Sequence, residues 1–160
     1  MIMKKLFVFA LAAMFSIAGF AKNTQDVIND IRQATNAQVL TLSKDLIQVQ
    51  AKNLPEDLKG IFDNIEEGTI VVLSEGSDEQ IKLFNDKLGE LDTNEYKTMA
   101  TFNDDSENIK VLGKSDGDNV TELVIIMTDD ETCALIDVTG KINKDNASKL
   151  LDKDTLKSLM

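Results

Sequence analysis

The sequence contains no histidine, no tryptophan, one cysteine and one proline in 160 residues. Without histidine there is no imidazole metal ligand, no serine–histidine–aspartate triad and no side chain whose unperturbed pKa lies near neutrality. Cys133 has no second cysteine to pair with, so the chain forms no internal disulfide. We expect Cys133 to be a half-buried structural thiol, and a bridge to another molecule is the alternative. These absences close most routes to hydrolytic and zinc chemistry.

Aromatic residues and positive charge are also scarce. Aromatics make up 5% of the chain, and half of them stand in the first 21 residues. Glycosidases need a carboxylate pair and usually hold sugars on aromatic platforms, so we do not expect sugar hydrolysis. Acidic residues outnumber basic ones by 28 to 17, for a net charge of −11. Such a field repels nucleic-acid phosphates and anionic membrane surfaces, and we expect no nucleic-acid partner.

The first 21 residues combine a basic start, an apolar run and small residues. Two lysines precede the 13-residue apolar run Leu6–Ala18, and Gly19–Ala21 places small residues at −3 and −1 relative to Lys22. This pattern predicts a signal peptide over residues 1–21, cleaved near Ala21. We therefore expect a periplasmic or secreted protein whose membrane contact is only transient, through that segment. An uncleaved anchor is the alternative, but 16 uncharged residues are short for a span of about 20.

Apolar residues between 22 and 95 recur mostly with the helical period of 3.6. Ser77 and Gln80 have the spacing of a capping box. Two short apolar runs predict strands, the second of them buried on both faces. The predicted elements are a helix over Asp26–Ala34 with Thr24 as its cap, a strand over Ala37–Leu42, a helix capped by Ser43, a helix from Pro55 that ends at Gly68, the strand Thr69–Leu73, and a helix after Ser77 with Ile81, Phe84, Leu88 and Leu91 facing inward.

From Tyr96 the period changes to about 2, which indicates strands. The Asp116-Gly117 pair predicts a hairpin with positive φ at both central residues. Short links favour an antiparallel meander. Residues 22–160 are therefore predicted to form one α+β domain, in which a mostly antiparallel sheet with a C-terminal four-stranded meander packs against about five helices. The predicted elements are the strands Tyr96–Phe102, Asn108–Lys114, Val120–Thr128 and Thr132–Thr139, the last broken by Gly140, and a terminal helix capped by Asn143 that carries Ala147, Leu150, Leu151 and Leu159.

The C-terminal half also carries a family resemblance. Tyr96–Leu151 resembles a family of exported bacterial proteins known as domain-of-unknown-function family 4252. The resemblance implies an α+β fold and export, and it assigns no catalytic residue. The segments that carry it are Tyr96–Met99, Asp104–Glu107, Ile109–Val111, Asp116–Asp118, Thr121–Ile126, Ala134–Ile142 and Ser148–Leu150.

Two turns of the predicted meander are rich in carboxylates. In an up-and-down meander the first and third connections lie at the same end of the sheet, so their side chains could share one rim. Hard cations such as Ca²⁺ take six to eight oxygen ligands, and a cation site is one hypothesis. Solvated turns of an acidic protein are the alternative, and no EF-hand pattern is present. The carboxylates concerned are Asp104, Asp105, Glu107, Asp129, Asp130 and Glu131.

The last predicted strand alternates between two faces. We expect Ala134, Ile136 and Val138 to face the helices and Cys133, Leu135 and Asp137 to point the other way, together with Leu112. If this second face is exposed, its apolar residues form a surface for an envelope protein partner. If an N-terminal helix covers it, it is core.

We expect a non-enzymatic exported protein of the bacterial envelope that binds a partner or ligand. An exported enzyme with carboxylate-based or cation-dependent chemistry is the alternative. No catalytic residue, cofactor or metal ligand is assigned. Ser74–Ser77 superficially resembles a phosphate loop, but it lacks a Gly-Lys pair and includes Glu75, so an ordinary strand-to-helix turn is expected.

Overall fold

The computed structural model describes residues 22–54, 56–151 and 154. The predicted signal peptide, the helix start at Pro55 and Leu159 lie outside the described residues. Within them the chain forms five helices and one six-stranded sheet, which confirms the α+β class. The elements are α2 (Thr24–Thr35), β1 (Gln38–Ser43), α3 (Lys44–Ala51), α4 (Glu56–Phe62), β2 (Ile65–Leu73), α5 (Asp78–Leu88), β3 (Lys97–Asn103), β4 (Asn108–Asp116), β5 (Asn119–Thr128), β6 (Cys133–Asn143) and α6 (Lys144–Leu150).

The strand order in the sheet is β1-β2-β6-β5-β4-β3, and every neighbouring pair is antiparallel. Strands β3 to β6 form the predicted meander. The pair β1–β2 joins it through β2 and β6, where Ile70 lies opposite Ile136. Among the described strands, this junction is the one pairing between strands that are not consecutive in the chain.

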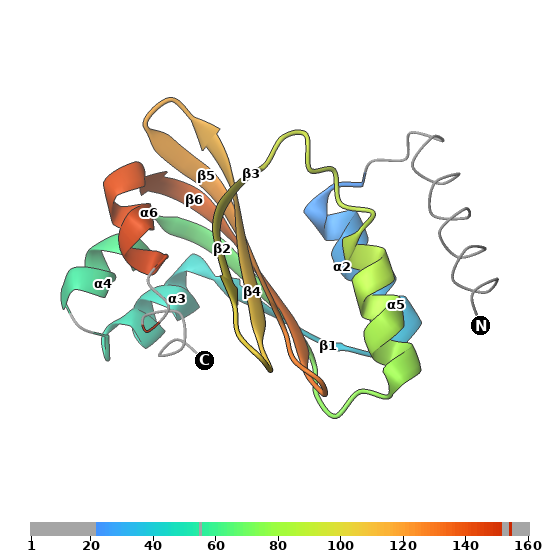
Figure 1. Ribbon diagram of the computed structural model, residues 1–160. Coiled ribbons are helices and arrows are strands. Elements are labelled where there is room, and N and C mark those ends of the chain that lie inside the picture. Colours follow the sequence, from blue (N-terminus) through green and yellow to red (C-terminus); the bar gives the residue numbers. More distant parts are fainter. Residues whose placement is uncertain (1–21, 55, 152–153, 155–160) are drawn as a thin grey trace.

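Helices cover both faces of the sheet (Figure 1), with α3, α4 and α6 on one side and α2 and α5 on the other. The first side holds Ile61 of α4 and Ala147 of α6 against Leu123 of β5. The second side buries Leu112 and Leu135, which are 4% and 0% exposed. The sequence left two alternatives for this sheet face, a partner surface or a core. At these positions it is core, covered by α2 and α5.

Polar side chains cap the helix starts. Ser43 caps α3, Asn143 caps α6, and Ser77 and Gln80 form the predicted capping box at α5. The predicted cap of α2 was wrong, because Asn23 rather than Thr24 accepts the Asp26 N–H. Thr24 is instead buried, and its hydroxyl hydrogen-bonds with the Tyr96 hydroxyl and the Glu122 carboxylate.

Gly68 does not end a helix, contrary to the prediction. Helix α4 ends at Phe62, and Gly68 lies inside β2, paired with Leu42 of β1 and Val138 of β6. The apolar spacing predicted the wrong helix end because Ile61 and Ile65 pack in the same core, although Ile61 is helical and Ile65 is extended.

Gly140 does not break the last strand, because β6 continues to Asn143. Its neighbour Lys141 donates its backbone N–H to the Asn64 carbonyl at 3.0 Å. A Cβ at position 140 would collide with that same carbonyl. Glycine is therefore required by the close approach of two backbones rather than by a chain break.

The predicted hairpin joins β4 to β5, but its central residues are Gly117 and Asp118, between the paired Asp116 and Asn119. Only Gly117 of these two has a positive φ, at 61°. Positive φ at the first central residue alone is the requirement of a type II′ turn. The prediction of positive φ at both positions was wrong.

Candidate functional site

The two carboxylate-rich turns lie at the same end of the sheet, as predicted, because Asn108 of β4 pairs with both Asn103 and Thr128. In each turn one aspartate side chain closes the turn itself. The Oδ1 atom of Asp129 accepts the backbone N–H groups of Glu131 and Thr132, and Asp104 Oδ1 accepts those of Ser106 and Glu107.

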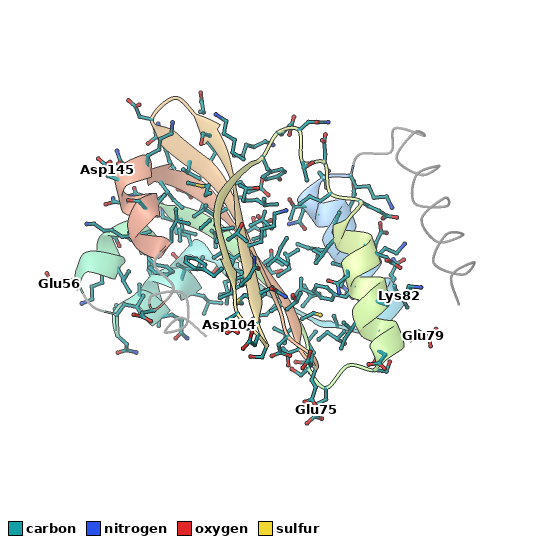
Figure 2. The ribbon with its side chains drawn as sticks, viewed as in Figure 1. Glu56, Glu75, Glu79, Lys82, Asp104 and Asp145 are labelled. Carbon is teal, nitrogen blue, oxygen red and sulfur yellow. The ribbon has the colours of Figure 1, made fainter. Side chains whose placement is uncertain are left out.

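Over the described part of the chain, no group of three or more acidic or cysteine side chains is arranged to hold a metal ion. The cation site at this rim is therefore not supported there. Figure 2 shows Asp104 and Glu75 toward this end, while the other labelled side chains lie on the outer sides of the helices. Ser74–Ser77 is a turn that leads from β2 to the cap of α5, with Gly76 donating its N–H to the Glu131 carbonyl.

A hydrogen-bonded cluster lies toward the other end, between the start of α2 and the sheet. The Tyr96 hydroxyl donates to Glu122 Oε2 at 2.8 Å, and the Thr24 hydroxyl donates to Glu122 Oε1 at 2.9 Å. The two hydroxyl oxygens are themselves 2.8 Å apart. Both carboxylate oxygens of Glu122 thus have donors. Burial raises the pKa of Tyr96, so the phenol stays protonated and keeps donating.

Asp137 lies next to this cluster and is 4% exposed. It is on the inward side of β6 facing α2 and α5, opposite Val124 of β5. Its Oδ1 atom is buried and has no hydrogen-bond partner among the residues that the structure describes. Burial raises the pKa of Asp137 to about 8; the neighbouring Glu122 carboxyl adds to the rise and Gln25 opposes it.

Two lysines flank the cluster, and each is ion-paired. Lys114 Nζ lies 2.7 Å from Glu95 and 5.5 Å from the centre of the Tyr96 ring. Lys22 Nζ lies 2.6 Å from Asp30 and 3.1 Å from Glu90. The Lys22 backbone is also held, because it donates to the Glu90 carbonyl and accepts from the Asp92 N–H.

These groups line a cavity of about 390 Å³. Carboxylates outnumber lysines in its wall by five to two, so the site favours cationic or donor groups over anions. The lining residues are Lys22, Asn23, Thr24, Gln25, Asp26, Asp92, Glu95, Tyr96, Lys114, Glu122, Asp137 and Thr139. We call this site the Asp137 cleft.

Sequence reasoning placed Asp137 on the correct face but did not identify it as a site residue, and it missed Thr24, Tyr96 and Glu122. One signal was available. A carboxylate at an inward position of an otherwise apolar strand costs folding free energy. Its presence there therefore points to a functional role. Cys133 was predicted to be half-buried, and the structure buries this free thiol completely, at 0% exposed.

Comparisons with known proteins give one match. No curated protein and no solved structure is significantly similar to the chain. None of the helices in residues 22–54 and 56–151 combines the length and the apolar character needed to cross a membrane. A family model described as "Domain of unknown function (DUF4252)" matches residues 14–150. Since that match covers most of the sequence, the chain belongs to the DUF4252 family.

Proposed function

We propose that this protein is a non-enzymatic binding module of the bacterial envelope, which works in the periplasm or outside the cell and takes a small polar ligand in the Asp137 cleft. The observation that carries the proposal is the Asp137 carboxyl, 96% removed from solvent with one oxygen unpartnered beside a cavity. The case for export rests on the signal-peptide pattern of residues 1–21.

Burying a carboxyl without a partner costs stability, and most buried polar groups in proteins are satisfied. An exception next to a cavity indicates a group whose partner comes from outside the chain. A volume of about 390 Å³ lies within the range of small-molecule sites. The wall contains polar groups that are held by hydrogen bonds within the protein and others that are exposed. Such a wall suits recognition of a polar ligand.

The organisation of the cluster favours binding over catalysis. Glu122 accepts from Thr24 and Tyr96, so neither of its oxygens is left without a donor to serve as a base. These bonds hold the wall rigid beside Asp137. A rigid wall with one open acceptor positions a ligand group, which is the task of a binding site.

An exported enzyme with carboxylate chemistry is the second candidate. The specific observation in its favour is the raised pKa of Asp137, about 8, which burial next to Glu122 produces. A carboxyl that is protonated near neutrality can act as a general acid. The cation-dependent version has no support in the described residues, where no group of three acidic or cysteine ligands forms.

The export part is tested by expressing the full chain in a Gram-negative host. We expect it in the osmotic-shock or medium fraction, with Lys22 as its first residue by N-terminal sequencing. Recovery of the unprocessed chain from the cytoplasm would contradict export.

The binding part is tested by screening chemically diverse small polar compounds against the ¹⁵N-labelled protein. We expect hits to shift the amide signals of Thr24, Tyr96 and Thr139, and to be recovered chemically unchanged after long incubation. A hit that is converted to product by the wild type, but not by Asp137→Asn, would instead establish the enzyme.

A further inference from the structure

The Asp137 cleft has one buried acceptor that the protein leaves open. Glu122 has a donor on each oxygen, from Thr24 and Tyr96. Asp137 Oδ1 has none, although its residue is only 4% exposed. A group that fills the cleft must therefore bring a donor to this oxygen.

The charge of the wall indicates which kind of hydrogen-bond donor the cleft accepts. Five carboxylates and two lysines line the cleft. Lys22 and Lys114 are both ion-paired, to Asp30 and Glu90 and to Glu95. A cation placed near Asp137 gains from the remaining negative charge, whereas an anion is repelled.

From these observations we infer that the Asp137 cleft binds a small organic cation, a primary ammonium group that donates an N–H to Asp137 Oδ1. This inference rests on the proposed binding function and names its ligand class. A bare metal ion fits less well, because Ca²⁺ or Mg²⁺ needs several free oxygen ligands and the two Glu122 oxygens are already in use.

Proton exchange accompanies such binding. The pKa of Asp137 is raised to about 8 by burial, with Glu122 of β5 and Glu67 of β2 adding to the rise and Gln25 of α2 opposing it. Below that pH the carboxyl holds a proton that an ammonium ligand must displace. The ammonium itself stays charged to roughly pH 10. The affinity should therefore rise about 50-fold in all from pH 6 to pH 8, less steeply as the pH nears the pKa, and only about twofold more above that.

The test uses a natural reporter. Tyr96 is the sole tyrosine of a chain without tryptophan, so tyrosine fluorescence reports on the cleft alone. The purified protein is titrated with n-butylammonium, with 1-butanol as the neutral isostere and with butyrate as the anion. We expect a saturable change with butylammonium only, stronger at pH 8 than at pH 6.

Two variants of equal charge change complete the test. Asp137→Asn should weaken butylammonium binding at least tenfold and remove its pH dependence. Asp118→Asn, at an exposed turn outside the cleft, should leave both unchanged. If Asp137→Asn does not fold, the pH dependence in the wild type still decides, because it needs no variant.

The possible failures are distinct. Saturable binding of 1-butanol or butyrate that matches or exceeds that of butylammonium overturns the ligand class and leaves the proposed binding function standing. The ligand class is also overturned if butylammonium gives no response at a roughly 50-fold excess over the protein. That excess reaches millimolar concentrations, at which a ligand with a weak Kd would still bind. Failure of every compound in the diverse screen overturns the proposed function itself.

Discussion

The two faces of one sheet differ in polarity. The face under α3, α4 and α6 is apolar from Ile109 to Ile142. The face under α2 and α5 is apolar around Leu135 and turns polar at Glu122 and Asp137. Because side chains alternate along a strand, consecutive residues of β5 and β6 serve opposite faces. One face can therefore supply stability while the other accommodates a costly carboxyl.

The largest effect is expected from placing a charge in either apolar region. Leu135→Glu and Leu123→Glu, one on each face, should each lower the free energy of unfolding by about 4 kcal/mol or prevent folding, because both side chains are at most 1% exposed. Leu40→Glu, at a position 55% exposed, is the control and should change it by less than ~0.5 kcal/mol. Urea denaturation measures all three. A Leu135→Glu protein of normal stability would show that α2 and α5 do not form a core with the sheet.

A smaller loss is expected where the apolar face meets the backbone. Gly140→Ala should cost about 2–3 kcal/mol, because its Cβ would collide with the Asn64 carbonyl. Gly60→Ala in α4, where a Cβ meets nothing within 4 Å, should be neutral or stabilise by ~0.5–1 kcal/mol. Thermal unfolding distinguishes them. Equal effects of the two substitutions would contradict the close approach at Gly140.

The polar region should make the stability of the protein depend on pH. The pKa of Asp137 in the folded chain, about 8, lies above its ordinary value of 3.8. Between these values the folded state holds a proton that the unfolded chain has lost, so this group's contribution to stability falls as pH rises from about 4 to 8. Asp137→Asn should remove that fall and be more stable than the wild type by ~2 kcal/mol at pH 8.

Urea denaturation of both proteins across pH 5 to 9 measures this difference, with Asp118→Asn as the exposed control. A stability difference between Asp137→Asn and the wild type that does not grow with pH contradicts a protonated, buried Asp137.

The smallest effect concerns the wall of the cleft. Tyr96→Phe keeps the ring but removes the donor to Glu122, and should cost about 1 kcal/mol of unfolding free energy. Thr24→Val removes the second donor. In a double-mutant cycle the two should be coupled by at least ~0.5 kcal/mol, because both hydroxyls act on one carboxylate. Purely additive losses would mean that the cluster is not a unit.

Much of the fold could be predicted from local pattern. Alternation located β3 to β6, and side-chain caps located the starts of α3, α5 and α6. These features depend on neighbours in the chain. The pairing of Ile70 with Ile136 could not be predicted, because nothing local specifies which distant strand completes the sheet.

The candidate site was hidden for a related reason. Asp137 follows apolar residues in β6, and its inward position in that strand does not reveal which groups lie beside it. Its proposed role depends on Thr24 and Tyr96 beside Glu122, which come from three separate segments. The glycine errors have the same origin, since Gly140 is required by Asn64, distant in sequence. Local patterns identify elements, whereas a site made of several elements exists only after they assemble.

The strand order also bears on how the chain folds. Among themselves, strands β3 to β6 pair only with sequence neighbours, and such local contacts form fast. The β2–β6 pairing joins segments more than sixty residues apart, since Thr69 lies opposite Asp137 and Ile70 opposite Ile136. Closing that long loop is the entropically expensive step, so the meander should assemble first and β1–β2 should dock last. Until that docking, β6 is a free edge, open to the wrong partner.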